Sequence, residues 1–319
     1  HGTLYLSEVL AVNESAHEVD GRFPDYIELS NAGSIRSLSG YSITDDPSEP
    51  RKFVFPAGAE ISAGLRLLIY ADSASGPGFR VGFSLNGAGE QVLLYNPDGA
   101  IVDSIAFGPQ ITDLSIGRTG PAETSWGLNF PTPGVANQRH SLGSPAGVCI
   151  NEWLSKPDVV YTRDFVELYN PDPLPVSIGG VFITDDPLNA ARGAVLPAMS
   201  FIAGGGFTVL EAVGSDANTP SELPFKLSAD YGWLALYGVN QVEIDRVHIV
   251  CDVPDQSRGR ETDGADLYAR FSIPTPGFSN ASDLTAESMV LQSLRITEIM
   301  YHPARFSDAE YIEVRNVGD

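Results

Sequence analysis

Three ionisable side chains recur along the chain in one order and could act together. They are Glu8, Glu28 and Arg118 in the first half, and Glu152, Glu167 and Arg260 in the second. A buried carboxylate costs several kcal/mol unless it is paired, and a guanidinium binds a carboxylate through two parallel hydrogen bonds. We therefore expect Glu28 to pair with Arg118, and Glu167 with Arg260, so that a late segment is fastened to an early strand. The alternative is general acid–base catalysis, which would need a pocket and would place the same site in the chain twice.

Two pairs of aspartates also carry oxygen ligands at close spacing. They are Asp45 with Asp46, and Asp185 with Asp186, each pair following a short apolar segment and preceding a proline. Aspartates in such positions commonly accept hydrogen bonds from the backbone of their own turn. Paired loop carboxylates can instead hold Ca²⁺, a hard cation that prefers oxygen ligands, so calcium is the alternative hypothesis. We expect no other cofactor, because the five histidines lack metal-ligand spacing.

These residues belong to an internal repeat. Its opening blocks are Ser7-Glu8-Val9 with DYIELSN at 25–31, Asn151-Glu152-Trp153 with DFVELYN at 164–170, and Thr297-Glu298-Ile299 with EYIEVRN at 310–316. The first two copies then share ITDDP at 43–47 and 183–187, Ser-x-Gly-Arg at 115–118 and 257–260, and Pro-Thr-Pro-Gly at 131–134 and 274–277. Blocks that keep one order at nearly constant spacing indicate one folding unit that occurs more than once.

The residues between these blocks predict β-strands. Ile27 and Leu29 fall on one face of a strand, with Tyr26 and Glu28 on the other. Short apolar runs alternate with turns rich in the 32 glycines and 23 prolines, at the spacing of a β-sandwich. No stretch keeps a helical apolar period for three turns, so we expect almost no helix.

The ordered series resembles the lamin tail domain. The resemblance is carried by the acid-aromatic-aliphatic-Glu-aliphatic-x-Asn block, by LSGYSITD at 38–45, by Phe55-Pro56, and by the Ser-x-Gly-Arg and Pro-Thr-Pro-Gly-x-x-Asn blocks. The second copy departs from it at 177–182. The family implies an all-β fold of tandem immunoglobulin-like β-sandwiches. We place these at 3–140 and 147–282, followed by the opening strands of a third copy at 293–319.

The resemblance also implies a location. Outside nuclear lamins, such domains resemble accessory modules of large secreted or surface proteins of bacteria. A nuclear lamin is not expected, because the chain repeats the module, lacks a heptad rod and is strongly acidic. We therefore expect a secreted or cell-surface protein.

The charge of the chain restricts its partners. Nineteen Lys and Arg face 41 Asp and Glu, a net charge of −22. Such a surface repels phosphate backbones and anionic headgroups, so nucleic acid is not an expected partner. No apolar run reaches the roughly 18–20 residues that span a bilayer, so membrane insertion is not expected. We expect a protein or cell-surface partner, with self-association through the bare strand edges of 293–319 as one route and packing on the second copy as another.

The two cysteines, Cys149 and Cys251, show no C-x-x-C zinc spacing. Cys149 lies on the first predicted strand of the second copy, and Cys251 lies near its late strands. Since the first and last strands of a sandwich can be neighbours, we expect a disulfide between them, with two buried thiols as the alternative. A disulfide would favour an oxidising compartment.

The leading functional hypothesis is a non-catalytic structural or interaction module, a spacer or adhesion-type unit of a larger protein. The alternative is a carbohydrate- or calcium-dependent ligand-binding accessory module attached to an enzyme. Aromatics exposed on one flat face would favour sugar, and the residues to check are Trp126, Trp153 and Trp233. An enzyme is the third reading and would need a deep pocket with converging carboxylates.

Overall fold

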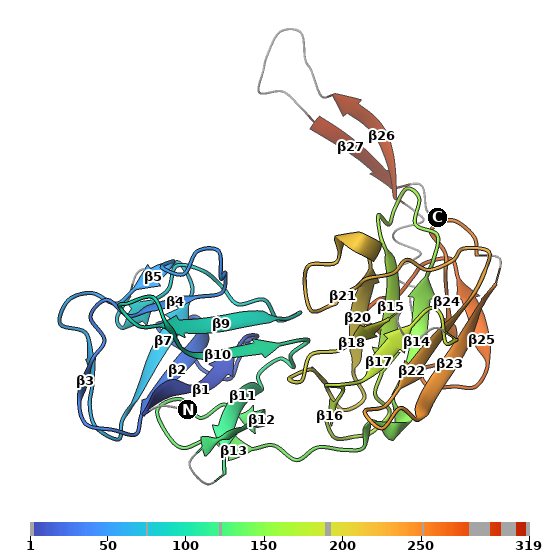
Figure 1. The fold of residues 1–319 in the computed structure, drawn as a ribbon. Coiled ribbons are helices and arrows are strands. Elements are labelled where there is room, and N and C mark those ends of the chain that lie inside the picture. The colour runs from blue at the N-terminus through green and yellow to red at the C-terminus, as the bar shows by residue number, and fades with distance from the viewer. Residues whose placement is uncertain are drawn as a thin grey trace.

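The computed structural model describes residues 3–74, 76–120, 123–188, 193–250, 252–280, 294–300 and 311–316. In these residues the regular structure is β-strand, apart from two short 3₁₀ helices at Pro145–Gly147 (η2) and Gly214–Asp216 (η3). The predicted all-β, immunoglobulin-like class is confirmed. Figure 1 shows two lobes side by side and a separate hairpin. No helix in the described residues is long and apolar enough to cross a membrane.

The first lobe is a sandwich of two main sheets. Its seven-stranded sheet has the order β13-β12-β11-β1-β2-β7-β8, its four-stranded sheet has the order β10-β9-β4-β5, and β3 pairs with β6. The bounds are β1 Leu4–Leu10, β2 Asp25–Asn31, β3 Arg36–Ser37, β4 Ser42–Thr44, β5 Phe53–Val54, β6 Glu60–Ile61, β7 Arg66–Ala71, β8 Phe79–Arg80, β9 Glu90–Tyr95, β10 Ile101–Phe107, β11 Ser115–Thr119, β12 Ser125–Phe130 and β13 Gln138–Arg139.

The second lobe repeats this plan with fewer strands. Its sheets have the orders β21-β20-β15-β14-β24-β25 and β18-β17-β22-β23, and β16 pairs with β19. The bounds are β14 Cys149–Leu154, β15 Asp164–Tyr169, β16 Val176–Ser177, β17 Phe182–Thr184, β18 Ala194–Val195, β19 Phe201–Ile202, β20 Phe207–Ala212, β21 Glu222–Leu223, β22 Tyr231–Tyr237, β23 Glu243–Val250, β24 Ser257–Arg260 and β25 Tyr268–Phe271.

Strand β2 shows why the repeated block has its pattern. Ile27 and Leu29 are fully buried in the core between the sheets, as their alternation predicts. Tyr26 and Glu28, on the other face, are also fully buried. The strand is therefore covered on both sides, and a glutamate on its second face needs polar partners there.

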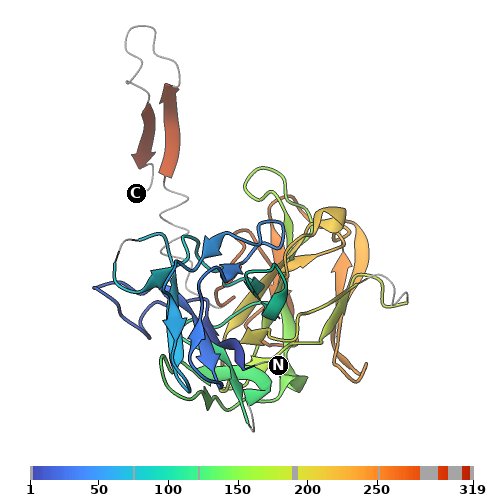
Figure 2. The ribbon, with the colours of Figure 1, turned by 60° about the vertical axis from the view of Figure 1, so that its left-hand side comes forward.

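The segment that is expected to open a third copy forms a hairpin in the described residues. Strands β26 (Leu294–Met300) and β27 (Tyr311–Asn316) pair with each other and project away from both lobes in Figures 1 and 2. Apolar side chains such as Ile296, Ile312 and Val314 are more than half exposed. Packing on the second lobe is one of the outcomes that the sequence predicts for this segment. The described hairpin does not pack there.

Candidate functional site

The recurring glutamates lie opposite one another on the first two strands of each lobe. Glu8 of β1 is the register partner of Glu28 of β2, and Glu152 of β14 is that of Glu167 of β15. A register shift just before Glu8 and just before Glu152 marks a β-bulge in the same place in both lobes. Directly opposed residues project from the same face, so each lobe holds two carboxylates side by side. All four side chains are fully buried.

The first glutamate of each pair binds both late repeat blocks. Glu8 accepts hydrogen bonds from Ser115 Oγ at 2.5 Å and from the Thr132 backbone N–H at 3.0 Å. In the second lobe, Glu152 accepts from the Ser257 hydroxyl, from the Thr275 N–H at 3.0 Å and from Thr275 Oγ1 at 2.8 Å. One buried carboxylate in each lobe thus explains why two residues recur, the serine of Ser-x-Gly-Arg and the threonine of Pro-Thr-Pro-Gly.

The second glutamate of each pair holds the glycine of the Pro-Thr-Pro-Gly loop. Gly134 donates its backbone N–H to Glu28 Oε2 at 2.6 Å, and Gly277 donates to Glu167 Oε2 at 2.6 Å. We call each set a carboxylate clasp. The first clasp is Glu8, Glu28, Ser115, Thr132 and Gly134, and the second clasp is Glu152, Glu167, Ser257, Thr275 and Gly277.

Asparagines complete the attachment of the late segment. Asn137 Nδ2 donates to the carbonyls of Ser7 at 2.7 Å and Arg118 at 2.9 Å. Asn280 Nδ2 donates to the Arg260 carbonyl at 2.7 Å in the second lobe. A Cβ on Gly117 would lie 2.6 Å from Asn137 Nδ2, so the glycine of Ser-x-Gly-Arg makes room for this amide.

The predicted pairing of the arginines is wrong. Arg118 Nη2 binds Asp103 at 2.9 Å, not Glu28, and Arg260 Nη2 binds Asp245 at 2.8 Å, not Glu167. The cause is strand alternation, because Gly117 is the residue opposite Glu8 and Arg118 therefore projects from the other face of the sheet. The aspartates stand at matching places in the repeat, so the sequence contained this signal.

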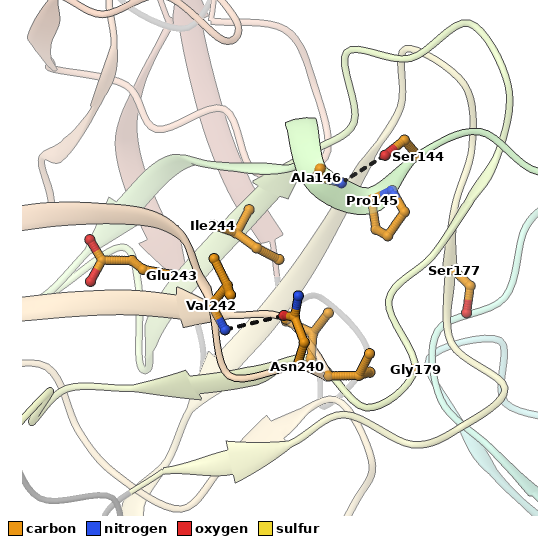
Figure 3. Close-up of a pocket in the computed structure, with 12 residues that line it drawn as sticks. Ser144, Pro145, Ala146, Ser177, Gly179, Asn240, Val242, Glu243 and Ile244 are labelled. Atoms are coloured by element: carbon orange, nitrogen blue, oxygen red, sulfur yellow. Dashed lines mark hydrogen bonds between the residues drawn. The ribbon is translucent and has the colours of Figure 1, made fainter.

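The clasps are closed to solvent, and burial is the main cause that raises the pKa of each of their glutamates. Four pockets on the described surface, of about 280 to 530 Å³, are lined by other residues. Figure 3 shows one of them, which lies between η2 and the turn from β22 to β23. Glu243 is its carboxylate and also pairs with Arg246. None of these four pockets is lined by a clasp glutamate, although one of them is lined by Asp164, Asp216 and Glu222.

The paired aspartates make contacts within their own turns. Asp46 Oδ1 accepts from the Ser48 N–H at 2.8 Å and from its hydroxyl at 2.7 Å, and Asp45 binds Lys52 Nζ at 2.7 Å. In the second lobe, Asp186 Oδ1 accepts from the Leu188 N–H at 3.3 Å. Within the described ranges, no group of three or more His, Cys, Asp or Glu could hold a metal ion. The contacts of Asp46 and Asp186 match the turn-capping interpretation, whereas Asp45 forms an ion pair with Lys52.

Asp185 lies between Thr184 and Asp186 in the matching turn of the second lobe. Together with Asp45, Asp46 and Asp186, it completes the set of four residues for which calcium was the alternative. The calcium hypothesis for this set stays a prediction that a titration can decide.

The predicted disulfide is not formed, since Cys149 is a free, buried thiol. Burial raises its pKa to about 11. Ile150, the next residue, donates its N–H to Asp245 at 2.7 Å, so Cys149 lies near the start of β23. Cys251 lies outside the described residues.

The three tryptophans do not form a flat platform. Trp153 is in the core at 1% exposure, and Trp126 lies under the Arg118 guanidinium, 4.8 Å from the ring centre. Trp233 is 37% exposed, but its ring stacks on His248 at 4.4 Å.

One recurring aspartate with a structural role was not predicted from the sequence. Asp113 and Asp255 each stand two residues before the Ser-x-Gly-Arg block and adopt positive φ angles of 61° and 54°. Asp113 accepts backbone N–H bonds from residues 14–16, and Asp255 from residues 158–161. Each aspartate therefore fixes the loop that joins the first two strands of its lobe.

The two lobes contact each other at a junction that the repeated sequence blocks do not predict. Phe201 donates its N–H to the Pro109 carbonyl at 2.9 Å, and Gly108 donates to the Met199 carbonyl at 3.2 Å. Gln110 Nε2 also donates to Met199 O, at 2.6 Å. The ring of Phe201, a residue of the second lobe, is 2% exposed and belongs to the core of the first lobe.

Comparisons with known proteins show a family similarity for part of the chain. No curated protein matches it. A solved structure of red sea bream transglutaminase is similar over 78% of this chain and 31% of its own length, with 11% identity and a TM-score of 0.18. This chain spans about a third of that structure, and the likeness carries no argument about function.

The family comparison covers the sequence up to the end of β10. Residues 1–109 match the family model described as Lamin Tail Domain. That family is immunoglobulin-like and non-catalytic. The matched part contains Glu8, Glu28 and the Asp45–Asp46 turn, but ends before the Ser-x-Gly-Arg block. The first 109 residues are thus similar to the lamin tail domain, a module of structural or interaction type.

Proposed function

We propose that this chain is a rigid, non-catalytic spacer or adhesion-type unit of a larger secreted or cell-surface protein. Residues 3–140 and 147–282 are, in this proposal, two lamin-tail-like modules, and 293–319 opens a third. The observation that carries it is the junction, where Phe201 of one lobe is buried in the core of the other. A flexible linker alone would leave the lobes free to reorient, as is the default for domains in one chain.

The clasps support a structural role for the recurring residues. Both carboxylates of the first clasp accept hydrogen bonds from the chain itself, through Ser115, Thr132 and Gly134. A buried, hydrogen-bonded carboxylate orders the segments that bind it and offers no site to a substrate. The same arrangement in two lobes is what a duplicated building unit requires.

The family resemblance supports the extracellular location, and the acidic surface supports the class of partner. A net charge of −22 keeps the protein soluble and repels anionic surfaces. A protein or cell-surface partner fits this surface better than nucleic acid. In the described residues, β26 and β27 form a sheet of two strands, and a small exposed sheet of this kind supports self-association as one mode of pairing.

Small-angle X-ray scattering tests the spacer proposal. The scattering of the full chain should fit the two-lobe arrangement of Figure 1 at both 50 mM and 500 mM salt. Phe201→Ala should broaden the distance distribution, because it removes the buried anchor of the junction. A wild-type curve that only an ensemble of lobe orientations can fit would refute the rigid unit.

A second candidate function has one observation in its favour. A pocket of about 530 Å³ on the second lobe is lined by the rings of Phe182 and Tyr237 and by Asp186 and Gln241. Aromatic rings with a few polar side chains are typical of small-ligand sites, and a neutral sugar fits this chemistry. Titration of ¹⁵N-labelled protein with neutral oligosaccharides should then shift the amides of 237–241. Shifts that persist in Phe182→Ser, which copies Ser42 of the first lobe, would reject this site.

A further inference from the structure

The two carboxylate clasps differ in one charged partner. In the first lobe, Arg66 Nη1 lies 3.0 Å from Glu28 Oε1, and the arginine side chain is 9% exposed. Arg66 of β7 is the register partner of Ser30 of β2. Its second nitrogen, Nη2, binds Glu123 at 2.5 Å. The first clasp thus contains a buried cation beside its second glutamate.

The second lobe has no arginine at this place. The matching register pair is Tyr169 of β15 with Phe207 of β20, so Phe207 occupies the position of Arg66. The two rings stack with their centres 5.0 Å apart. Glu167 Oε1 accepts a hydrogen bond from Asn151 Nδ2 at 3.0 Å, as Glu28 Oε1 accepts one from Ser7 Oγ at 2.5 Å, but among the described residues no cation is added to it. A neutral amide cannot balance the charge of a buried carboxylate as a guanidinium does.

The charged groups around Glu167 are mostly acids. Glu152 faces it from β14, and Asp263, from the loop after β24, accepts from the same Asn151 amide at 3.0 Å. Arg260 of β24 points away and is bound to Asp245 at 2.8 Å. The loop before β15 adds the Tyr161 hydroxyl, which interacts with Glu152. On β20, the partner of Glu167 is Val209, and Glu211 is bound to Arg163.

These surroundings favour the protonated form of Glu167. Burial raises its pKa to about 8, the hydrogen bonds from Asn151 and Gly277 oppose this rise, and repulsion by Glu152 and Asp263 adds to it. Burial also raises the pKa of Glu28, but there Arg66 opposes the shift. A carboxyl whose pKa is higher in the folded protein than in the open loop stabilises the closed form most in acid. That stability is lost as the pH rises from about 4.5 to about 8.

We infer that the second clasp is a pH-responsive latch on the Pro-Thr-Pro-Gly loop at 274–277. It is closed while Glu167 carries a proton, and it loosens when Glu167 is ionised beside Glu152 and Asp263. The first clasp responds less, because Arg66 pairs with Glu28 and opposes the rise of its pKa. The proton leaves to solvent when the loop opens. The C-terminal edge of the second lobe, β24 and β25, therefore becomes easier to detach as the pH rises, while the first lobe stays closed.

Amide hydrogen exchange of the full chain tests the latch at two matched glycines. Gly277 donates to Glu167 as Gly134 donates to Glu28, both at 2.6 Å. One linked proton raises the opening constant about tenfold per pH unit. After correction for intrinsic exchange, the opening of Gly277 should rise about 50-fold from pH 6 to pH 8. Gly134 should change only a few-fold.

Two variants separate the latch from ordinary loosening. Glu167→Gln cannot ionise, so the pH dependence of Gly277 should disappear. Phe207→Arg supplies the cation that the first clasp has, and it should flatten the same profile while leaving Gly134 unchanged. Equal pH profiles for Gly277 and Gly134 in the wild type would overturn the inference. So would a steep Gly277 profile that survives in Phe207→Arg, a variant that keeps Glu167 and serves if Glu167→Gln does not fold.

Discussion

Replacing Phe201 with alanine should destabilise the first lobe, although Phe201 lies in a strand of the second lobe. The residue begins β19 of the second lobe, where it pairs with Ser177 through the backbone. Its ring is buried in the first lobe, and its backbone N–H donates to the carbonyl of Pro109 in that lobe. A Phe→Ala change in a core costs about 3–5 kcal/mol, from lost transfer energy and the cavity left behind. At about 3 °C per kcal/mol, the melting temperature of the first lobe should fall by about 10 °C.

Differential scanning calorimetry measures this effect. The wild type should unfold with coupled lobes, and Phe201→Ala should separate a lower transition for the first lobe. Phe225→Ala is the matched control, because Phe225 is equally buried but lies within the core of the second lobe. That control should lower the second transition. The reasoning is refuted if Phe201→Ala lowers the second-lobe transition and leaves the first unchanged.

Three further outcomes follow from single contacts. Arg118→Lys should cost about 1–3 kcal/mol in urea unfolding, because lysine cannot bind Asp103 and the Leu6 carbonyl together as the guanidinium does; an unchanged midpoint would speak against this role. Asp255→Ala should speed amide exchange at 158–161 at least tenfold, since it removes the acceptor of these four N–H groups, and unchanged protection would reject the loop-fixing role. Millimolar Ca²⁺ should leave both transitions in place, because Asp45 is bound to Lys52; a stabilisation near 2.7 kcal/mol, expected at about 100 times the Kd, would restore the calcium hypothesis.

The sequence predicted what depends on local pattern and repetition. The alternation of Ile27 and Leu29 predicted a strand, and the recurrence of Glu28 as Glu167 predicted a buried, partnered carboxylate. The predicted partner was wrong because Arg118 projects from the other face of the sheet, where it binds Asp103, and Arg66 is the arginine that pairs with Glu28. Phe207 occupies the position of Arg66 in the second lobe, so a search for residues shared by both copies does not find Arg66.

Other features depend on the tertiary arrangement. Phe201 reads as a core residue of its own lobe, because nothing in one strand specifies which core receives an aromatic ring. The position of Cys149 near the start of β23 likewise follows from the packing of two sheets. Asp113 and Asp255 could have been found, since their spacing from the Ser-x-Gly-Arg block is the same in both copies.

Residual dipolar couplings of the full chain test the rigid two-lobe unit most directly. The couplings of backbone amides in 3–139 and in 149–280 should fit one alignment tensor of common magnitude and orientation, because the buried Phe201 ring and the hydrogen bonds of Gly108 and Pro109 fix the lobes together. Two tensors of different magnitude would mean that the lobes move independently, and the proposed spacer would then lack its physical basis.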